Sequence, residues 1–475
     1  MIAAGWAAIN GLWFAADASK RYRAEAAWFL FAAVLIIIAI GAIARGDHED
    51  ASPVTRTRVV DVSLPAFVIL AIALFYPVLP IGLLSDDFVL FARAQTGALV
   101  DTSWEFLRPL PLALWGSADD PLTLHALNIG LHGVNAGLTA ILATRFGLAR
   151  TPALLAGLVF LALPTSVEAV SWAAGVFDVL LATLILTACV AVTTLHGGRR
   201  VLASALLTAA ALATKETAVI TPGILLIASF CARDRFRHAV VSAAVAAGMV
   251  AIYLAIRTAA GFASAPPAQG ASGYVLKEFL SRPFATLGLP FHQEFLESQR
   301  WIRYGFAMLW PILFAASAIR WRSDRDLAMR VLGCVLWIVV SVLPLATMLF
   351  IADDLQGSRY VYLASAAFSI MLAALTAHLN QTRQLILLAP LIALFAVAAR
   401  THQSSWIDAA RERDRVLDAY RTAALNCVPA SVSGLPDQVR GAYVFRNGFT
   451  EAIRQSTSSI TACDLTWDGD RFIER

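Results

Sequence analysis

The chain alternates long apolar runs with short polar segments, and most of the runs are long enough to cross a lipid bilayer. A transmembrane helix needs about 20 mainly apolar residues. On this criterion we expect about thirteen spans, near residues 1–16, 26–45, 60–84, 124–144, 152–166, 176–195, 201–213, 217–231, 239–257, 302–319, 331–351, 361–379 and 384–400. The pattern therefore predicts an all-α polytopic membrane protein.

Composition agrees with this class. Of the 475 residues, 59% are hydrophobic and only 15% are charged, which is more apolar than a typical soluble domain. The formal net charge of +4 does not indicate a nucleic-acid partner, because the basic residues fall mostly in short loops between apolar runs. Abundant Ala and very few Lys residues favour a bacterial source with a GC-rich genome. We therefore expect a bacterial inner-membrane protein.

The charges of the loops predict the orientation of the bundle. Cytoplasmic loops of membrane proteins are enriched in Lys and Arg. The basic loops on one side of the predicted bundle hold Arg145, Arg150, Arg199, Arg200, Arg233, Arg235, Arg237, Arg320, Arg322, Arg325 and Arg330. We assign this side to the cytoplasm, which places the opposite loops in the periplasm or at the cell exterior.

The predicted spans divide the chain into three parts. Residues 1–59 form N-terminal transmembrane helices, residues 60–400 form the main transmembrane domain, and residues 401–475 form a small extracytoplasmic domain of mixed structure. Together with long outward loops at 85–123 and 258–301, the tail places any active site on the outward face. We expect the tail to begin as an amphipathic helix, to continue as short β or irregular pieces, and to pack against the outward loops.

Two of the five cysteines, Cys427 and Cys463, lie in the outward tail. In an oxidising compartment a disulfide between them would stabilise a small domain. The sequence leaves open whether it forms. The other three, Cys189, Cys231 and Cys334, lie in or next to apolar spans, where a free thiol behaves as a small apolar residue.

An acidic pair, Asp86 and Asp87, stands where a long apolar run emerges into water. A partly desolvated carboxylate at this boundary can act as a general base or hold a divalent ion. The alternative is that two Asp residues after a helix end only keep that end in water. A second pair, Asp119 and Asp120, precedes Pro121, and we assign it to helix capping.

Four polar residues in the next predicted helix share one face. His125, Asn128, His132 and Asn135 have the spacing i, i+3, i+7 and i+10, which places them within about 80° of one another around the helix. Polar side chains in a span usually face the bundle interior. Interhelical hydrogen bonding is the favoured interpretation for Asn128, His132 and Asn135, whereas His125, nearest the outward surface, is a candidate ligand contact.

Charged residues of both signs follow on the predicted outward face, and each of these residues, taken alone, can have a purely structural role. These residues are Arg108, Glu168, Lys215, Glu216 and Arg359. Together they suit an anionic lipid headgroup bound beside a base. In the outward segment 258–301, His292 and Glu294 are a weak candidate for an ion site, and a surface loop is the favoured interpretation there.

The order of these motifs resembles the membrane glycosyltransferases of the GT-C class, and most closely the transmembrane O-mannosyltransferases that carry tetratricopeptide repeats. The matching positions are Asp86, Asp87 and Phe88; Arg108, Pro109 and Leu110; Pro121, His125, Asn128 and His132; Pro164, Glu168, Ala169 and Val170; Lys215 and Glu216; Arg359, Tyr362 and Leu363. The chain departs from the family at Val176, where an Arg is common, and at Ser358, where a Glu is common. It also shows no helical repeats after the last span.

The resemblance implies a GT-C-like bundle that transfers a sugar from a polyprenyl-phosphate donor to a glycan, lipid or protein acceptor at the extracytoplasmic face. On this basis we hypothesise that Asp86 or Asp87 is the general base and that a divalent cation, Mg or Mn, is a candidate cofactor. The candidate phosphate ligands are Arg359, Lys215, Arg108 and Tyr362. The candidate substrate-positioning residues are Glu168, His125 and Glu216, and the candidate metal ligands are Asp86, Asp87, His292 and Glu294.

The competing class is a transporter or flippase of a lipid-linked sugar. Such a protein should show paired repeats, broken helices and charges near the bilayer midplane. The sequence contains no convincing internal repeat, and its acidic residues cluster at one predicted surface. A non-catalytic scaffold is a third class that composition leaves open.

Overall fold

The computed structural model describes residues 64–97, 107–118, 120–261, 276–306, 324–345, 349–423, 427–454 and 462–474. The expected spans at 1–16 and 26–45 lie outside the described residues, as does most of the expected span at 302–319. The predicted N-terminal part, residues 1–59, also lies outside them.

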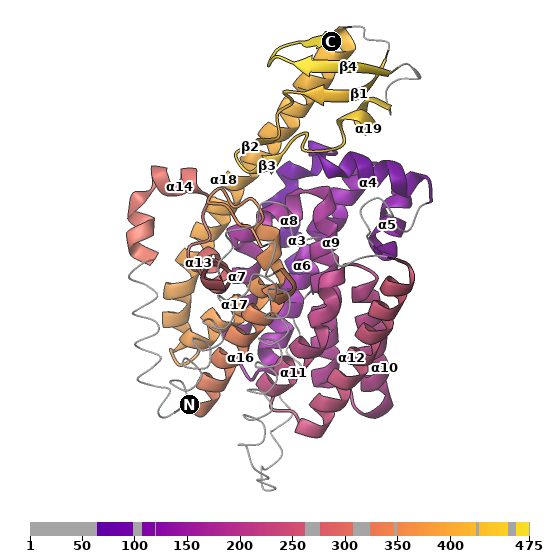
Figure 1. The fold of residues 1–475 in the computed structure, drawn as a ribbon. Helices are drawn as coiled ribbons and strands as arrows, with labels where there is room; N and C mark the ends of the chain where they lie inside the picture. Colours follow the sequence, from indigo (N-terminus) through magenta and orange to yellow (C-terminus); the bar gives the residue numbers. More distant parts are fainter. Residues whose placement is uncertain are drawn as a thin grey trace.

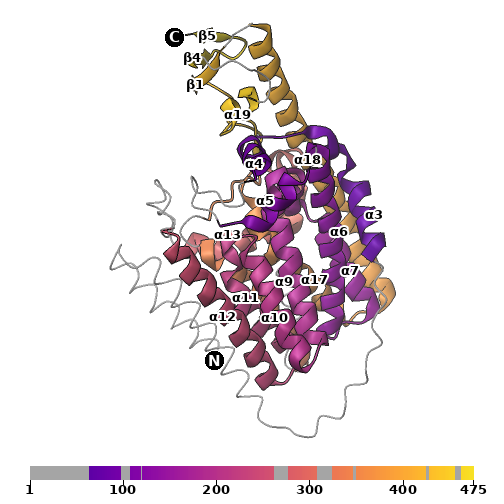
Figure 2. The same ribbon diagram turned by 90° about the vertical axis from the view of Figure 1, so that its right-hand side faces the viewer.

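Most of the described chain forms one helical bundle (Figures 1 and 2). Its helices are α3 (Leu64–Phe75), α6 (Pro121–Arg145), α7 (Arg150–Ala162), α9 (Val176–Thr194), α10 (Gly197–Leu212), α11 (Thr221–Cys231), α12 (Phe236–Ala259), α16 (Arg325–Val342), α17 (Tyr362–Thr376) and the first part of α18 (Gln381–Thr422). Every residue of α17 is buried. Its many Ala and Ser residues allow neighbouring helices to approach closely on all sides.

The second half of α18 and the described residues from 427 onward form a small unit, which we call the C-terminal unit. Short helices and 3₁₀ turns connect the bundle helices at the end that carries this unit (Figure 1). They include α4 (Asp86–Gln95), α5 (Pro109–Gly116), α8 (Val167–Ser171), α13 (Leu276–Gly288), α14 (Gln293–Ser298), η1 (Tyr76–Ile81), η2 (Pro164–Ser166), η3 (Ala173–Gly175), η4 (Glu216–Ile220), η5 (Leu343–Leu345) and η6 (Ser358–Val361). We call this end of the bundle the site end, because most of the candidate residues lie on these short elements.

Seven helices in the described part are long and apolar enough to cross a membrane, or eight if the pair Arg150–Ala162 and Pro164–Ser171, bent by 50°, counts as one span. The described structure therefore supports a polytopic membrane protein. Two expected spans, 201–213 and 217–231, are the shorter helices α10 and α11, with 16 and 11 residues. The expected count of thirteen stays a prediction.

The basic loops meet at the end of the bundle opposite the site end. Arg200 pairs with Asp234, and Arg233 pairs with Asp326. Arg330 Nε donates a hydrogen bond of 2.5 Å to the carbonyl of Phe146, in the loop that follows α6. The predicted gathering of these loops at one end is confirmed for the described residues. Their assignment to the cytoplasm stays a prediction.

The C-terminal unit grows directly from the bundle, because α18 is one continuous helix of 42 residues. The predicted domain boundary at residue 401 lies inside this helix. The second half of α18 is amphipathic, as predicted, and buries Trp406, Val416 and Tyr420. Beyond it lie β1 (Val428–Ser433), β2 (Gln438–Val439), β3 (Ala442–Tyr443), α19 (Phe449–Arg454), β4 (Ala462–Trp467) and β5 (Phe472–Glu474). Strand β4 pairs parallel with β1 and antiparallel with β5, and β2 pairs antiparallel with β3.

The C-terminal unit packs against the start of α4, as the sequence predicts. The backbone N–H of Ser85 donates to the carbonyl of Val444 at 2.9 Å. Gly448 has a φ of +85°, and a Cβ there would lie 2.4 Å from the carbonyl oxygen of Ser85. Only glycine permits this backbone conformation together with this close approach.

Cys427 and Cys463 form the disulfide that the sequence left open, across a separation of 36 residues. The bond joins the start of β1 to β4, next to the end of α18. It therefore closes the C-terminal unit into a loop that includes β2, β3 and α19.

Replacing both Cys427 and Cys463 by serine should lower the free energy of unfolding of the C-terminal unit by about 4 kcal/mol, the chain-entropy value for a loop of this length. Hydrogen–deuterium exchange of β1 and β4 in the purified protein measures this loss as faster amide exchange. The matched control is Cys334→Ala, which changes a buried free cysteine of the bundle. Unchanged exchange in β1 and β4 of the serine variant would contradict the prediction.

Candidate active site

Asp87 is fully buried at the first turn of α4. Its Oδ2 accepts a hydrogen bond from the backbone N–H of Leu84 at 2.9 Å, and its Oδ1 accepts one from the N–H of Ala174 at 2.8 Å. Burial raises the pKa of this carboxyl well above its usual value, although the two N–H donors act in the opposite direction. Asp87 therefore fixes the start of α4 against η3.

Asp86 is only partly buried, and its carboxylate points to the C-terminal unit. Its Oδ1 accepts a hydrogen bond of 2.6 Å from the side-chain amide of Asn447. Of the two neighbouring carboxylates, Asp86 is the one that solvent reaches. A general base must reach the proton that it removes, so the two Asp residues have different chemical capacities.

Glu168 and Arg359 form a buried ion pair between α8 and η6. Glu168 is 1% exposed, and it accepts hydrogen bonds from the guanidinium of Arg359 and, at 3.0 Å, from the backbone N–H of the same residue. The hydroxyl of Tyr443 also donates to Glu168 Oε1 at 3.3 Å. These contacts orient the guanidinium through one carboxylate.

Three aromatic rings surround the Arg359 guanidinium. Its central carbon lies 4.6 Å from the ring centroid of Tyr360, 5.0 Å from that of Trp172 and 5.7 Å from that of Tyr443. Such cation–π contacts are favourable, and more so in a desolvated site. The Trp172 indole N–H donates to the carbonyl of Leu84 at 3.2 Å. Trp172 thus connects the surroundings of Arg359 to the turn that Asp87 holds.

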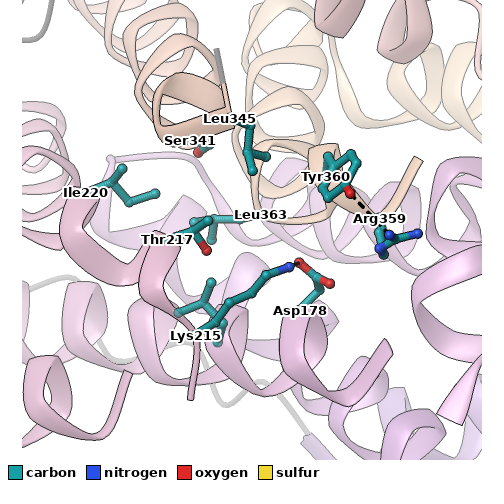
Figure 3. A pocket seen from close by; sticks show the side chains of 10 residues that line it. Asp178, Lys215, Thr217, Ile220, Ser341, Leu345, Arg359, Tyr360 and Leu363 are labelled. Atoms are coloured by element: carbon teal, nitrogen blue, oxygen red, sulfur yellow. Dashed lines mark hydrogen bonds and ion pairs between the residues drawn. The ribbon is translucent and has the colours of Figure 1, made fainter. Parts of the chain in front are cut away.

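A small pocket brings two of the predicted phosphate ligands together (Figure 3). Its lining includes Lys215, which precedes η4, and Arg359, which belongs to η6. Lys215 Nζ lies 2.5 Å from Oδ1 of Asp178, a residue of the first turn of α9 that also lines the pocket. The remaining lining residues are Leu181, Thr217, Ile220, Ser341, Leu345, Tyr360 and Leu363. Two cations, one carboxylate and one phenol therefore face one small space.

Asp86 and Asp87 do not belong to the described lining of this pocket. The carboxylate that does belong to it is Asp178, which was not among the predicted site residues. A signal for it exists in the sequence, because Asp178 follows Glu168 on the predicted outward face, where charges of both signs gather. Its pairing with Lys215, 37 residues away, depends on the packing of α9 against the turn before η4.

Arg108 and Glu216 bind each other, and neither residue belongs to the described lining of the pocket. Arg108 Nε lies 2.9 Å from Glu216 Oε2, and its Nη2 lies 2.6 Å from Oε1, which is a bidentate geometry. This pair joins the start of α5 to η4. Glu216 directly follows Lys215 in the chain, so the pair helps to position the turn that supplies the pocket lysine.

The polar face of α6 makes interhelical hydrogen bonds, as favoured for three of its four residues. Asn128 donates to the carbonyl of Trp172 at 2.8 Å, and Asn135 donates to the hydroxyl of Tyr362 at 3.2 Å. His132 hydrogen-bonds the same hydroxyl at 2.8 Å. Tyr362, a predicted phosphate ligand, therefore directs its buried hydroxyl into the bundle.

His125, the fourth residue of this face, is fully buried and hydrogen-bonds the carbonyl of Gly82 at 3.0 Å. Asp120 caps α6 by accepting a hydrogen bond from the N–H of Thr123 at 2.8 Å, which confirms its structural assignment. Asp119 lies outside the described residues.

His292 and Glu294 engage the C-terminal unit. His292 Nε2 lies 3.2 Å from the carbonyl oxygen of Arg440, and Glu294 Oε2 lies 3.2 Å from the Arg440 guanidinium. Across the described residues, no group of three or more His, Cys, Asp or Glu side chains is arranged to hold a metal ion. Asp87, moreover, uses both oxygens on backbone N–H groups. A divalent cation as cofactor stays a prediction.

Comparison with models of known protein families and with curated protein sequences finds no match. Among solved structures, the chain is similar to ArnT from Cupriavidus metallidurans, whose crystal structure contains bound undecaprenyl phosphate. The two share 13% sequence identity over 84% of this chain and 89% of ArnT, with a TM-score of 0.47.

Proposed function

We propose that the chain is a GT-C-type glycosyltransferase that moves a sugar from a polyprenyl-phosphate donor to an acceptor hydroxyl. The observation that carries this proposal is the pocket that Lys215 and Arg359 line together at one end of an apolar helical bundle. The ordered motifs of the sequence support it independently, because both cations occupy positions that match the resembled family. The proposed location is a bacterial inner membrane, with the site end in the periplasm or at the cell exterior.

In this proposal the two cations bind the donor phosphate. As the bond between the anomeric carbon and the phosphate oxygen breaks, its electron pair moves to the departing lipid phosphate. Preorganised cations stabilise charge that develops in a transition state. Arg359 offers a planar fork of donors, and Lys215 offers a compact point charge. A donor whose polyprenyl tail stays in the bilayer can present its phosphate at this end of the bundle.

The acceptor hydroxyl oxygen attacks the anomeric carbon, and its proton passes to a carboxylate. We assign this base to Asp86, because it is the more exposed of the acidic pair. Asp87 then holds the loop in place through Leu84 and Ala174. Glu168 acts on the substrate indirectly, by orienting Arg359. No step is assigned to a metal ion, and the acceptor is a glycan, a lipid or a protein.

Replacing Lys215 by Met together with Asp178 by Asn should weaken binding of a short polyprenyl phosphate, such as farnesyl phosphate, by about 10-fold, the value of one charge-assisted hydrogen bond. The double change removes the cation without leaving Asp178 as a buried unpaired charge. Binding is measured on the purified protein in nanodiscs. Turnover is measured as polyprenyl phosphate released from a panel of polyprenyl-phosphate hexoses and pentoses.

The matched control is Arg200→Gln with Asp234→Asn, which removes a buried ion pair at the opposite end of the bundle. This variant should bind the phosphate like the wild type. Equal loss of binding in both double variants would assign Lys215 to stability alone. Donor binding without turnover of any member of the panel would count against transfer and in favour of a transporter.

A further inference from the structure

One residue of the C-terminal unit forms hydrogen bonds with two residues of the candidate active site. Tyr443, in β3, is 4% exposed, although it follows Arg359 by 84 residues in the chain. Its hydroxyl accepts a hydrogen bond of 2.9 Å from Arg359 Nη1 and donates one of 3.3 Å to Glu168 Oε1. Its ring lies 4.8 Å from that of Trp172, centroid to centroid. The phenol therefore bridges both members of the buried ion pair.

The Tyr443 phenol is suited to this bridging position. Burial raises its pKa, and the nearby Glu168 carboxylate raises it further, so the hydroxyl keeps its proton. A neutral hydroxyl can accept from the guanidinium and donate to the carboxylate at the same time. With the phenol in place, the orientation of Arg359 is fixed from two sides.

A second residue of the same segment contacts the proposed base. Asn447 donates its side-chain amide to Asp86 at 2.6 Å. Tyr443 and Asn447 are separated by only three residues, so one short stretch of the C-terminal unit contacts both the proposed base and a proposed phosphate ligand.

The backbone of this stretch is built to approach the bundle closely. Gly441 has a φ of +83°, and a Cβ there would lie 2.8 Å from the carbonyl oxygen of Asp354, in the segment that leads to Arg359. Gly448, at the other end, makes the corresponding approach to Ser85, next to Asp86. The backbone of residues 441–448 is therefore held against both loops that carry the proposed catalytic groups.

We propose that residues 441–448 are an integral part of the active site, with Tyr443 as the positioning residue for Arg359 and Asn447 as the positioning residue for Asp86. This inference rests on the proposed glycosyl transfer. It makes the C-terminal unit a participant in the chemistry of the bundle rather than a separate domain attached to it. In particular, the tail sets the direction from which the guanidinium meets the donor phosphate.

The test compares Tyr443→Phe with Tyr420→Phe. Tyr420 belongs to the same unit, and its buried hydroxyl bonds the carbonyl of Cys427, away from the pocket. We expect Tyr443→Phe to raise the KM for the donor and to lower kcat/KM by about 10-fold, the value of one hydrogen bond to a charged group. Tyr420→Phe should change thermal stability and leave both kinetic constants unchanged. Indistinguishable kinetics in the two variants would overturn the proposal.

Asn447→Ala provides a second variant that removes an exposed contact and should fold normally. It should lower kcat without raising the donor KM, because Asp86 acts on the acceptor and not on the donor phosphate. If both constants equal those of the wild type, the assignment of Asn447 is wrong.

A readout without substrate separates this inference from the proposed function. Hydrogen–deuterium exchange of residues 358–363 should be faster in Tyr443→Phe than in the wild type, and unchanged in Tyr420→Phe. If the wild-type protein shows no turnover, the proposed function is wrong. The exchange of residues 358–363 would still show whether Tyr443 positions this segment. Unchanged exchange in Tyr443→Phe would refute the positioning role.

Discussion

Replacing Arg359 by Gln should lower kcat/KM for glycosyl transfer by about 10³-fold, because the site loses a preorganised cation at the departing phosphate. The same change should lower the free energy of unfolding by about 3–5 kcal/mol, since it leaves a buried carboxylate without its partner. Glu168, the residue left behind, is 1% exposed. Turnover is measured as released polyprenyl phosphate, and stability as thermal unfolding in detergent.

The two effects separate in the double variant Glu168→Gln with Arg359→Gln. Two neutral amides of similar shape can bond each other, so we expect this variant to recover most of the lost stability and none of the lost activity. Arg359→Lys keeps the charge but loses the fork that contacts Glu168 and Tyr443, and should fall between wild type and Arg359→Gln. If the double variant regains turnover together with stability, Arg359 has no direct role in transfer.

The sequence predicts the long elements of this fold well, because a span is recorded locally as an apolar run. The apolar windows of α6, α9, α12 and α16 fall where expected. Where an apolar run ends, however, the helix need not end. The run near residue 400 gives way to polar residues, but α18 continues to Thr422 because its second half buries Trp406 and Tyr420 against the C-terminal unit.

The candidate site could be predicted only as a set of charges on one face. Lys215 and Arg359 were expected there, and the structure places both in one pocket. The contact between Arg359 and Tyr443 was not predicted, because the two residues are 84 positions apart in the chain and no local sequence pattern indicates that contact. For Tyr362, in contrast, the sequence predicted a contact with the phosphate that its buried hydroxyl does not favour. It matches the family motif, but its position in α17 directs its hydroxyl to His132 and Asn135.

Asp86 and Asp87 should give different results when each is replaced alone, because we assign catalysis to the first and structure to the second. Asp86→Asn should lower kcat by about 10²- to 10⁴-fold, the usual contribution of a general base, and should leave thermal stability nearly unchanged because Asp86 is only partly buried. Asp87→Asn should instead destabilise the protein. Both oxygens of Asp87 accept backbone N–H bonds, whereas Asn would turn its NH2 group, which cannot accept, toward one of these two donors, so about 1–3 kcal/mol is lost.

The pH dependence of stability distinguishes these roles further. Burial raises the pKa of Asp87 above its ordinary value of 3.8, so the folded protein binds this proton more tightly than the unfolded chain. The stability that this proton provides is complete below the ordinary pKa and is lost as the pH rises through the raised value. The wild type should therefore exceed Asp87→Asn in unfolding temperature most at low pH, and the difference should narrow as the pH rises. A difference that widens with rising pH would mean that Asp87 is ionised in the folded protein, and the base would then have to be reassigned between the two carboxylates.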